Sequence, residues 1–271
     1  MPRLIYGTAW KERRTTELVV RAVRAGFAGI DTACQPKHYN EAGVGAALSE
    51  LALQGVERKS LFLQTKFTPL SGHDPKRIPY DRTSPLEQQV AQSFAASQRN
   101  LGTEYVDSLV LHSPLSDFAD LLTVWRAMEA IAQSGGARQL GISNCYDTRL
   151  LQRLHAAAAV KPAVVQNRFY SDSGFDRELR AFCREQGIVY QSFWSLTANP
   201  HILRHPSVLA MSQELRRTPA QVWFRFLTQI GIVPLTGTSS QEHMDQDLAI
   251  FEFELSQLQL DQISNLLVLK R

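Results

Sequence analysis

Eight short apolar runs alternate with longer amphipathic segments along this chain, and this repetition restricts its fold more than any other feature. Successive parallel strands need a helical connection between them, so the pattern indicates repeated βα units. Eight units within 271 residues favour an α/β fold, a (β/α)8 TIM barrel, as a single domain over residues 1–271. An open doubly wound sheet is less suitable, because it usually carries a glycine-rich first turn. The strands are predicted at residues 4–6, 29–31, 61–66, 108–112, 138–142, 164–167, 188–193 and 232–234.

Glycine and proline mark the ends of the helical segments. Gly26 and Gly136 are predicted to end helices, and the pair Thr218-Pro219 is predicted to begin one, as an N-cap followed by a first-turn proline. The stretch Gly43-Val44-Gly45 lies inside a helical pattern and lacks the third glycine of a dinucleotide-binding turn. We therefore interpret it as a place where helices pack closely.

Composition excludes several classes of partner. The formal net charge of +3 comes from 29 basic and 26 acidic residues spread along the chain, which argues against nucleic acid binding. The cysteines form no CxxC pair, which argues against a disulfide framework and a cysteine-rich zinc site. Neither an N-terminal apolar region nor a run of about 18 apolar residues occurs, so secretion and membrane insertion are not expected. We expect a cytoplasmic monomer.

Ionisable residues close three consecutive predicted strands. Asp31 ends the second strand, Lys66 the third and His112 the fourth, while Tyr39 follows in the loop after Asp31. Each alone has an ordinary explanation, such as a capping aspartate or a buried histidine. Together they are hard to explain that way, because barrel interiors favour valine, isoleucine and leucine and the strand ends converge on one face. The four side chains therefore predict an active site at that face.

These groups suit acid–base chemistry at a carbonyl. A pair of Lys66 with Asp31 would hold the ammonium near the Tyr39 phenol, and we expect this charge to lower the pKa of Tyr39. His112 could then hydrogen-bond the substrate oxygen and polarise the carbonyl. The segment 71–85, rich in turn-forming residues, follows the third strand directly and is predicted to lie over this face.

Other reactive residues have simpler explanations. His201 and His205 have the i, i+4 spacing of a helical zinc site, but two flanking prolines leave barely one turn of helix between them. A solvated surface turn is favoured, and no metal is expected. Cys34 lies next to the predicted site, where a buried, inert thiol is favoured over a redox-sensitive one.

The motifs around the strand ends resemble those of the aldo-keto reductase superfamily along nearly the whole chain. GIDTACQPKHYNEAGVGAAL is similar to the family's Asp-Thr-Ala to Tyr-Asn-Glu signature, LQTK to its lysine strand, and VDSLVLHSP to its histidine strand. The resemblance implies NAD(P)H-dependent reduction of aldehydes or ketones to alcohols, with hydride delivered from nicotinamide C4. It also implies that Asp31, Tyr39, Lys66 and His112 form the catalytic tetrad, with Tyr39 as proton donor.

Downstream motifs resemble the segments that surround the nicotinamide in this family. LGISN and VVQNRFY imply that Ser143, Asn144 and Gln166 hold the carboxamide. QSFWSL implies that the ring of Phe193 stacks on the nicotinamide. Trp10, in GTAWK, matches an aromatic wall of the substrate pocket.

The phosphates of the cofactor are expected beyond the nicotinamide. Barrels of this kind often bind phosphate at the loops after strands seven and eight, where main-chain amides and a helix N-terminus favour negative charge. The resemblance implies NADPH, but NADH stays open, because Leu235 stands at the family's lysine position for the 2′-phosphate and His243 at its adenine-side arginine position. The residues implied beside the diphosphate and adenosine phosphates are Ser195, Leu196, Gly237, Thr238, Ser239 and Ser240.

The chain departs from the family's pattern in its loops. Between Asp31 and Tyr39 the stretch CQPKH is longer than the common spacing, so this loop must bulge to return the phenol to the pocket. The usual N-terminal hairpin is missing, and the C-terminal loop after a helix at residues 257–267 is short. We infer an open pocket that accepts small aldehydes or ketones broadly.

Two other functions stay open at this point. The fold could serve as a regulatory module that binds the cofactor with little turnover, and consumption of NADPH with an aldehyde would exclude this. Alternatively, Lys66 could act as a Schiff-base amine in a lyase or isomerase, with His112 as acid and base. Borohydride trapping of substrate on the protein would support that alternative.

Overall fold

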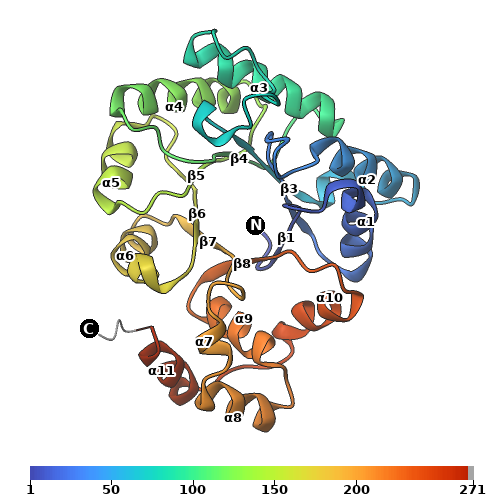
Figure 1. Cartoon of the computed structure of the whole chain (residues 1–271), viewed down its shortest axis with the longest axis vertical. Helices are drawn as coiled ribbons and strands as arrows, with labels where there is room; N and C mark the ends of the chain where they lie inside the picture. Colours follow the sequence, from blue (N-terminus) through green and yellow to red (C-terminus); the bar gives the residue numbers. More distant parts are fainter. Residues whose placement is uncertain (268–271) are drawn as a thin grey trace.

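The computed structural model describes residues 1–267, and within them eight parallel strands close into one barrel (Figure 1). Each strand pairs with the next in chain order, and the last returns to pair with the first. The predicted (β/α)8 TIM barrel is confirmed. The strands are β1 (Ile5–Gly7), β2 (Gly29–Asp31), β3 (Phe62–Phe67), β4 (Ser108–Leu111), β5 (Leu140–Ser143), β6 (Val164–Arg168), β7 (Val189–Phe193) and β8 (Ile232–Thr236).

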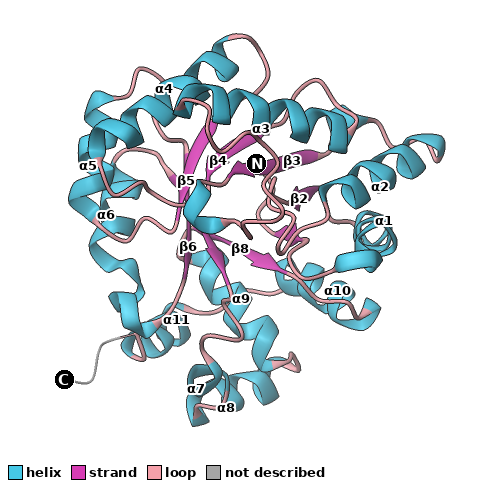
Figure 2. Ribbon diagram, turned by 45° about the horizontal axis from the view of Figure 1, so that its top comes forward, coloured by secondary structure: helices cyan, strands magenta, loops and turns pink. Residues whose placement is uncertain are grey.

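Helices surround the barrel as an outer ring, and the connection between β7 and β8 extends away from it (Figure 2). Among residues 1–267, no helix is both long enough and apolar enough to cross a membrane. The helices are α1 (Thr15–Ala25), α2 (Glu41–Leu53), α3 (Leu86–Leu101), α4 (Phe118–Gln133), α5 (Thr148–Ala157), α6 (Arg177–Glu185), α7 (Pro200–Leu203), α8 (Pro206–Leu215), α9 (Pro219–Gln229), α10 (Gln241–Leu248) and α11 (Gln257–Asn265).

The predicted element boundaries hold closely. The strand at 29–31 coincides with β2, and the other predicted strands overlap observed ones with ends displaced by one or two residues. Thr218 caps α9 and Pro219 is its first residue, as predicted. Gly26 ends α1 with φ 120°, also as predicted. The prediction for Gly136 was wrong in detail, because the left-handed glycine after α4 is Gly135, with φ 84°.

The apolar core lies between the barrel and the helical ring. Trp125 of α4 and Trp223 of α9 are fully buried there, so the helices are held by contact with the outer surface of the sheet. The inside of the barrel differs, because Gln64, Lys66 and Gln191 are all buried polar residues. A barrel interior usually consists of branched apolar side chains. The polar interior is therefore where a site can be built.

Helices α2 and α3 approach each other at Gly45. A Cβ atom placed on this glycine would lie 2.0 Å from the carbonyl oxygen of Asn100, which is main chain and has no freedom to move aside. The interpretation of the Gly43-Val44-Gly45 stretch as a helix-packing contact is thus confirmed.

Replacing Gly45 by alanine should destabilise the protein. In an open helix position the change would stabilise by about 1 kcal/mol through helix propensity. Here the clash with Asn100 forces the helices apart, and overpacking of this kind costs about 1–3 kcal/mol. We expect a net loss of up to about 2 kcal/mol in the free energy of unfolding, measured with urea. Ala46→Ser on the exposed side of the same helix is the control, and a Gly45→Ala protein at least as stable as the parent would contradict the packing argument.

Candidate active site

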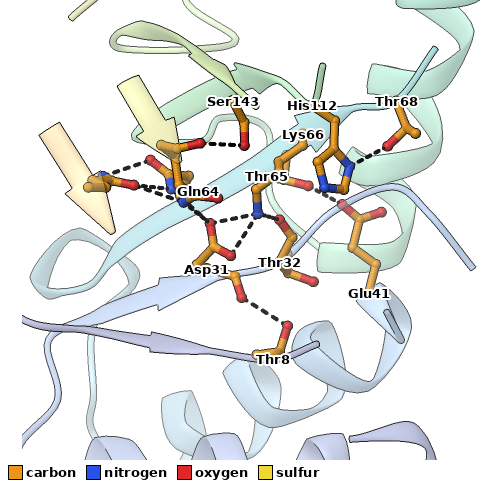
Figure 3. Close-up of polar contacts among 12 residues, drawn as sticks. Thr8, Asp31, Thr32, Glu41, Gln64, Thr65, Lys66, Thr68, His112 and Ser143 are labelled. Atoms are coloured by element: carbon orange, nitrogen blue, oxygen red, sulfur yellow. Dashed lines mark hydrogen bonds and ion pairs between the residues drawn. The ribbon is translucent and has the colours of Figure 1, made fainter. Parts of the chain in front are cut away.

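Three strand ends bring the predicted ionisable residues to one end of the barrel. Asp31 is the last residue of β2, Lys66 the next-to-last residue of β3, and His112 follows β4 directly. The strands are neighbours in the sheet, in the order β2, β3, β4. Figure 3 shows that these side chains converge, as the parallel arrangement of strands requires.

Asp31 and Lys66 form a buried ion pair. The ammonium Nζ lies 2.6 Å from one carboxylate oxygen and 2.7 Å from the other, and it donates a further hydrogen bond of 2.8 Å to the carbonyl oxygen of Thr32. The side chains are 0% and 3% exposed, so water screens this pair very little. Burial lowers the pKa of Lys66, while the charge of Asp31 opposes that shift. The three ammonium hydrogens are thus directed at these three oxygen atoms (Figure 3).

Tyr39 reaches this pair although its loop is long. The N–H groups of His38 and Tyr39 both donate to the carbonyl oxygen of Gln35, and the N–H of Trp10 donates to His38 at 2.7 Å, which closes the bulge expected from the sequence. The Lys66 Nζ lies 5.2 Å from the centre of the Tyr39 ring. The structure therefore brings the phenol into the same cluster.

The expected pKa of Tyr39 was wrong in direction. Burial raises it above the ordinary range for tyrosine, and the negative charge of Asp31 raises it further. The lysine charge does not reverse this, because Lys66 is already paired with Asp31. The phenol therefore keeps its proton throughout the neutral pH range.

His112 lies edge-on to Tyr39, with 5.9 Å between the ring centres. Its Nδ1 and the Thr68 hydroxyl are hydrogen-bonded at 2.7 Å, and its carbonyl oxygen accepts a hydrogen bond of 2.8 Å from the Asn144 side chain. Burial lowers the pKa of His112 well below its ordinary value, and the nearby charge of Lys66 acts in the same direction. The imidazole is thus neutral at pH 7.

Thr68 is itself held by the segment predicted to cover this face. The carbonyl oxygen of Thr68 accepts hydrogen bonds from the Tyr80 hydroxyl at 2.7 Å and from the His73 Nε2–H at 3.0 Å. Thr68 was not predicted from the sequence. Its position two residues after Lys66, on the same side of an extending strand, was the available signal.

Three glutamines form a hydrogen-bonded layer beneath the ion pair. Gln64 and Gln191 exchange two hydrogen bonds, of 2.8 and 3.1 Å. Gln64 and Gln166 each donate to one oxygen of Asp31, at 2.7 and 3.0 Å. The sequence analysis missed Gln64 and Gln191. In LQTK, Gln64 stands two residues before Lys66 and so faces the same side of the strand.

Asp31 fixes which way the amide of Gln166 points. An ionised carboxylate only accepts hydrogen bonds, so the NH2 group of Gln166 must face Asp31. The same NH2 group donates to Gln191 at 2.9 Å. The amide oxygen of Gln166 accepts no hydrogen bond from residues 1–267, so it can accept one from a ligand.

The other predicted nicotinamide residues lie close by. Ser143 is buried and donates to the carbonyl oxygen of Gln166 at 2.7 Å. Asn144 has a left-handed backbone, with φ 53°, and its side chain turns to His112. Phe193 is half-buried at the end of β7. These residues occupy neighbouring strand ends, β5, β6 and β7.

Some of the residues predicted to contact the phosphates are buried, and others are exposed. The Ser195 hydroxyl faces inward, 2.8 Å from the Ser192 hydroxyl, and Leu196 packs on the core. Only their main chain is thus available to a phosphate. The loop after β8 is open, because Gly237 and Ser239 are exposed.

This loop leads into α10. Ser240 caps the helix by accepting the N–H of His243, while Thr238 accepts the N–H of Ser240 at 3.1 Å. Lys11, which the sequence analysis missed, donates from its Nζ to the carbonyl oxygen of Gly237 and adds a positive charge here. A helix N-terminus with a neighbouring cation favours an anion.

Trp10 lies at the rim of the barrel rather than in its core. Its side chain is 59% exposed, and its ring lies against that of His38 in a tilted arrangement, with 3.9 Å between the ring centres. His38, in the longer loop, thus packs against one face of the Trp10 ring. The rest of the ring is exposed to solvent and is available to a ligand.

The residues set aside in the sequence analysis have structural explanations. Cys34 is buried, and burial raises its pKa to about 12, as expected for an inert thiol. His205 caps α8 by accepting the N–H of Ser207 at 3.3 Å. Over residues 1–267, no group of His, Cys, Asp and Glu has the arrangement of a metal site.

The sequence is similar to proteins of known family. The sequence matches the Aldo/keto reductase family over residues 3–206. It is 31% identical to the glyoxal reductase of Bacillus subtilis over 252 residues, which are 93% of this chain and 83% of that protein. It is also 31% identical to an aldo-keto reductase of Mycolicibacterium vanbaalenii over 249 residues, 92% of this chain and 81% of that one.

Solved structures have the same fold. The aldo/keto reductase from Brucella melitensis superposes with a TM-score of 0.83 at 26% identity, covering 98% of this chain and 95% of that one. The aldo-keto reductase of Bombyx mori in complex with NADP has a TM-score of 0.82 at 23% identity, covering 98% and 89%. The fold, the site and these matches define an NAD(P)H-dependent carbonyl oxidoreductase. The chain belongs to the Aldo/keto reductase family.

The glutamine layer should show strong energetic coupling. Gln64→Met or Gln191→Met alone leaves the partner amide buried without its bonds, so each should cost about 2–3 kcal/mol in the free energy of unfolding. The double variant removes both amides, and its cost should be about 1–2 kcal/mol less than the sum of the single costs. Urea unfolding measures all three. Gln133→Met, an exposed change on α4, should be additive with Gln64→Met; full additivity of the Gln64 and Gln191 changes would refute the coupling.

Proposed function

We propose that this protein reduces aldehydes or ketones to alcohols with NADPH, and that Tyr39 supplies the proton. The observation that carries the proposal is the cluster of one protonated phenol, one neutral imidazole and one buried ammonium–carboxylate pair at the barrel end. The names of two relatives, a glyoxal reductase and an aldo-keto reductase, support a small carbonyl compound as substrate.

The residues at the barrel end fit a nicotinamide dinucleotide. Gln166 has a free amide oxygen for the carboxamide, near Ser143 and Asn144, and Phe193 has a half-exposed ring for stacking. Residues 237–240 with Lys11 suit the phosphates, and His243 is exposed on the adenine side. When bound, the cofactor supplies a hydride. NADPH is proposed because the Bombyx mori neighbour was solved with NADP, while the burial of Leu235 keeps NADH open.

The chain's own residues then divide the proton chemistry. We assign the Thr68 hydroxyl as the donor to Nδ1 of His112, which puts the single proton of the neutral imidazole on Nε2, where it can hydrogen-bond the carbonyl oxygen. This bond orients and polarises the carbonyl. Tyr39 gives its proton to the oxygen as negative charge develops there. Lys66, with its Nζ 5.2 Å from the ring centre, keeps the charge of Asp31 neutralised beside the phenolate that remains.

The Schiff-base alternative is disfavoured by the surroundings of Lys66. A nucleophilic amine must be neutral and accessible, but this one is completely buried and bonded to both oxygens of Asp31. A purely regulatory role leaves the ordered acid–base cluster without a use. Neither alternative explains the arrangement as well as carbonyl reduction does.

Tyr39→Phe should abolish turnover while the fold is kept. General acid catalysis contributes about 10²–10⁴-fold, so kcat for NADPH-dependent reduction of 4-nitrobenzaldehyde should fall by at least about 100-fold. NADPH binding, followed by fluorescence quenching, should stay within about threefold of the parent, since binding and proton transfer are separate. Tyr105→Phe makes the same chemical change just before β4, at the opposite end of the barrel. Retention of activity in Tyr39→Phe would exclude Tyr39 as the proton donor.

Thr68→Val should lower kcat by about tenfold, because the imidazole of His112 loses the partner that fixes its tautomer and orientation. Thr68→Ser keeps the hydroxyl and should be within about twofold of the parent enzyme. The pair of variants separates the hydrogen bond from simple packing. Equal activity in the two variants would mean that Thr68 does not position His112.

A further inference from the structure

Arg168 is the last residue of β6, and it stands two residues after Gln166. Side chains two apart on a strand face the same side, so Arg168 points toward the barrel axis, one step nearer the open end than Gln166. Gln166 itself contacts Asp31. The guanidinium of Arg168 contacts aromatic residues that follow β6 and β7.

Two aromatic rings hold this guanidinium in place. Its central carbon lies 4.2 Å from the centre of the Trp194 ring and 5.1 Å from that of the Tyr170 ring. The main-chain N–H of Arg168 donates to the Tyr146 hydroxyl at 3.2 Å. Contacts between a guanidinium and aromatic faces fix its orientation while they leave its N–H groups free.

The hydrogen-bonding capacity of Arg168 is unused. Its guanidinium makes neither a hydrogen bond nor an ion pair with any part of residues 1–267, so all five N–H donors are available. Arg58 and Arg138 give the contrast. They also stack on a ring, that of Tyr105, but each forms a 2.9 Å ion pair with Asp107. Those two arginines are structural, whereas Arg168 has a free binding surface.

Trp194 is presented at the barrel mouth by a constrained backbone. It is 49% exposed and adopts a left-handed conformation, with φ 54°, which bulky residues rarely adopt. The next residue, Ser195, is anchored through its carbonyl oxygen, which accepts hydrogen bonds of 2.9 Å from Trp223 and Asn199. The ring is thus held outward against Arg168 before any ligand arrives.

We propose that Arg168, backed by Trp194 and Tyr170, forms an oxyanion-binding subsite at the mouth of the barrel. The planar fork of N–H donors matches a carboxylate or a phosphate, which it can bind through two parallel hydrogen bonds. The oxyanion comes either from a carboxylate on the carbonyl substrate or from the diphosphate of the cofactor, because β6 borders both the nicotinamide residues and the loop after β7. The substrate part of this inference rests on the proposed function.

The experiment compares Arg168→Met with Arg153→Met in the full-length protein. Arg153 also lies over a ring, that of Phe118, at 3.9 Å, but on α5 outside the barrel, so it controls for the loss of one charge. We measure KM for 4-carboxybenzaldehyde and for 4-nitrobenzaldehyde, and the Kd for NADPH. If the substrate supplies the oxyanion, Arg168→Met should raise KM for the carboxylated aldehyde by about tenfold and that for the neutral one by less than about twofold.

If the cofactor supplies the oxyanion, Arg168→Met should raise the Kd for NADPH by about tenfold. It should then change KM for the two aldehydes by the same factor. Unchanged values for the aldehydes and for NADPH, or equal effects of Arg153→Met, would overturn the proposal.

A separate binding test uses benzoate and inorganic pyrophosphate, followed through tryptophan fluorescence, since Trp194 contacts Arg168. Binding lost in Arg168→Met, in a protein that reduces no aldehyde, would support the subsite while the proposed function fails.

Discussion

The ion pair between Asp31 and Lys66 is the contact on which the site depends. Two charges in an interior with almost no solvent are stable only when each is paired and hydrogen-bonded. Removing one partner of such a pair costs about 3–5 kcal/mol, because the other charge stays buried. The pair lies between the neighbouring strands β2 and β3, and the same carboxylate orients Gln64 and Gln166. Stability and chemistry are not separable here.

The pair also explains the protonation of its neighbours. An ammonium whose charge is matched by a carboxylate has little effect left to withdraw a proton from a buried phenol, so Tyr39 remains an acid. Burial disfavours a positive charge on the imidazole, and the nearby Lys66 acts in the same direction, so His112 remains neutral. The result is a site that stores a transferable proton on tyrosine and offers a neutral donor beside it. Both properties suit an oxygen on which negative charge develops.

The sequence predicted the barrel and the residues at its strand ends because both follow from local patterns. Apolar runs with helical spacers define β2 and its neighbours to within two residues. The resemblance to aldo-keto reductases added Gln166 and the residues beyond it. Gln64, Gln191 and Thr68 were missed because their partners lie on other strands, up to 127 positions away in the chain. The pKa of Tyr39 was missed because its direction depends on burial, which no motif encodes.

The glutamine layer inside the barrel has a consequence for how such a chain can vary. Directional amide bonds link β3, β6 and β7 through Gln64, Gln166 and Gln191, so an exchange on one strand leaves unmatched polar atoms on another. Substitutions at these three positions should therefore occur together in evolution. A single substitution destabilises the protein, whereas a set of compensating substitutions is tolerated. Sequence libraries that randomise one of these strands should recover glutamine almost alone, whereas libraries that randomise all three together should also recover other polar combinations that keep two donors to Asp31.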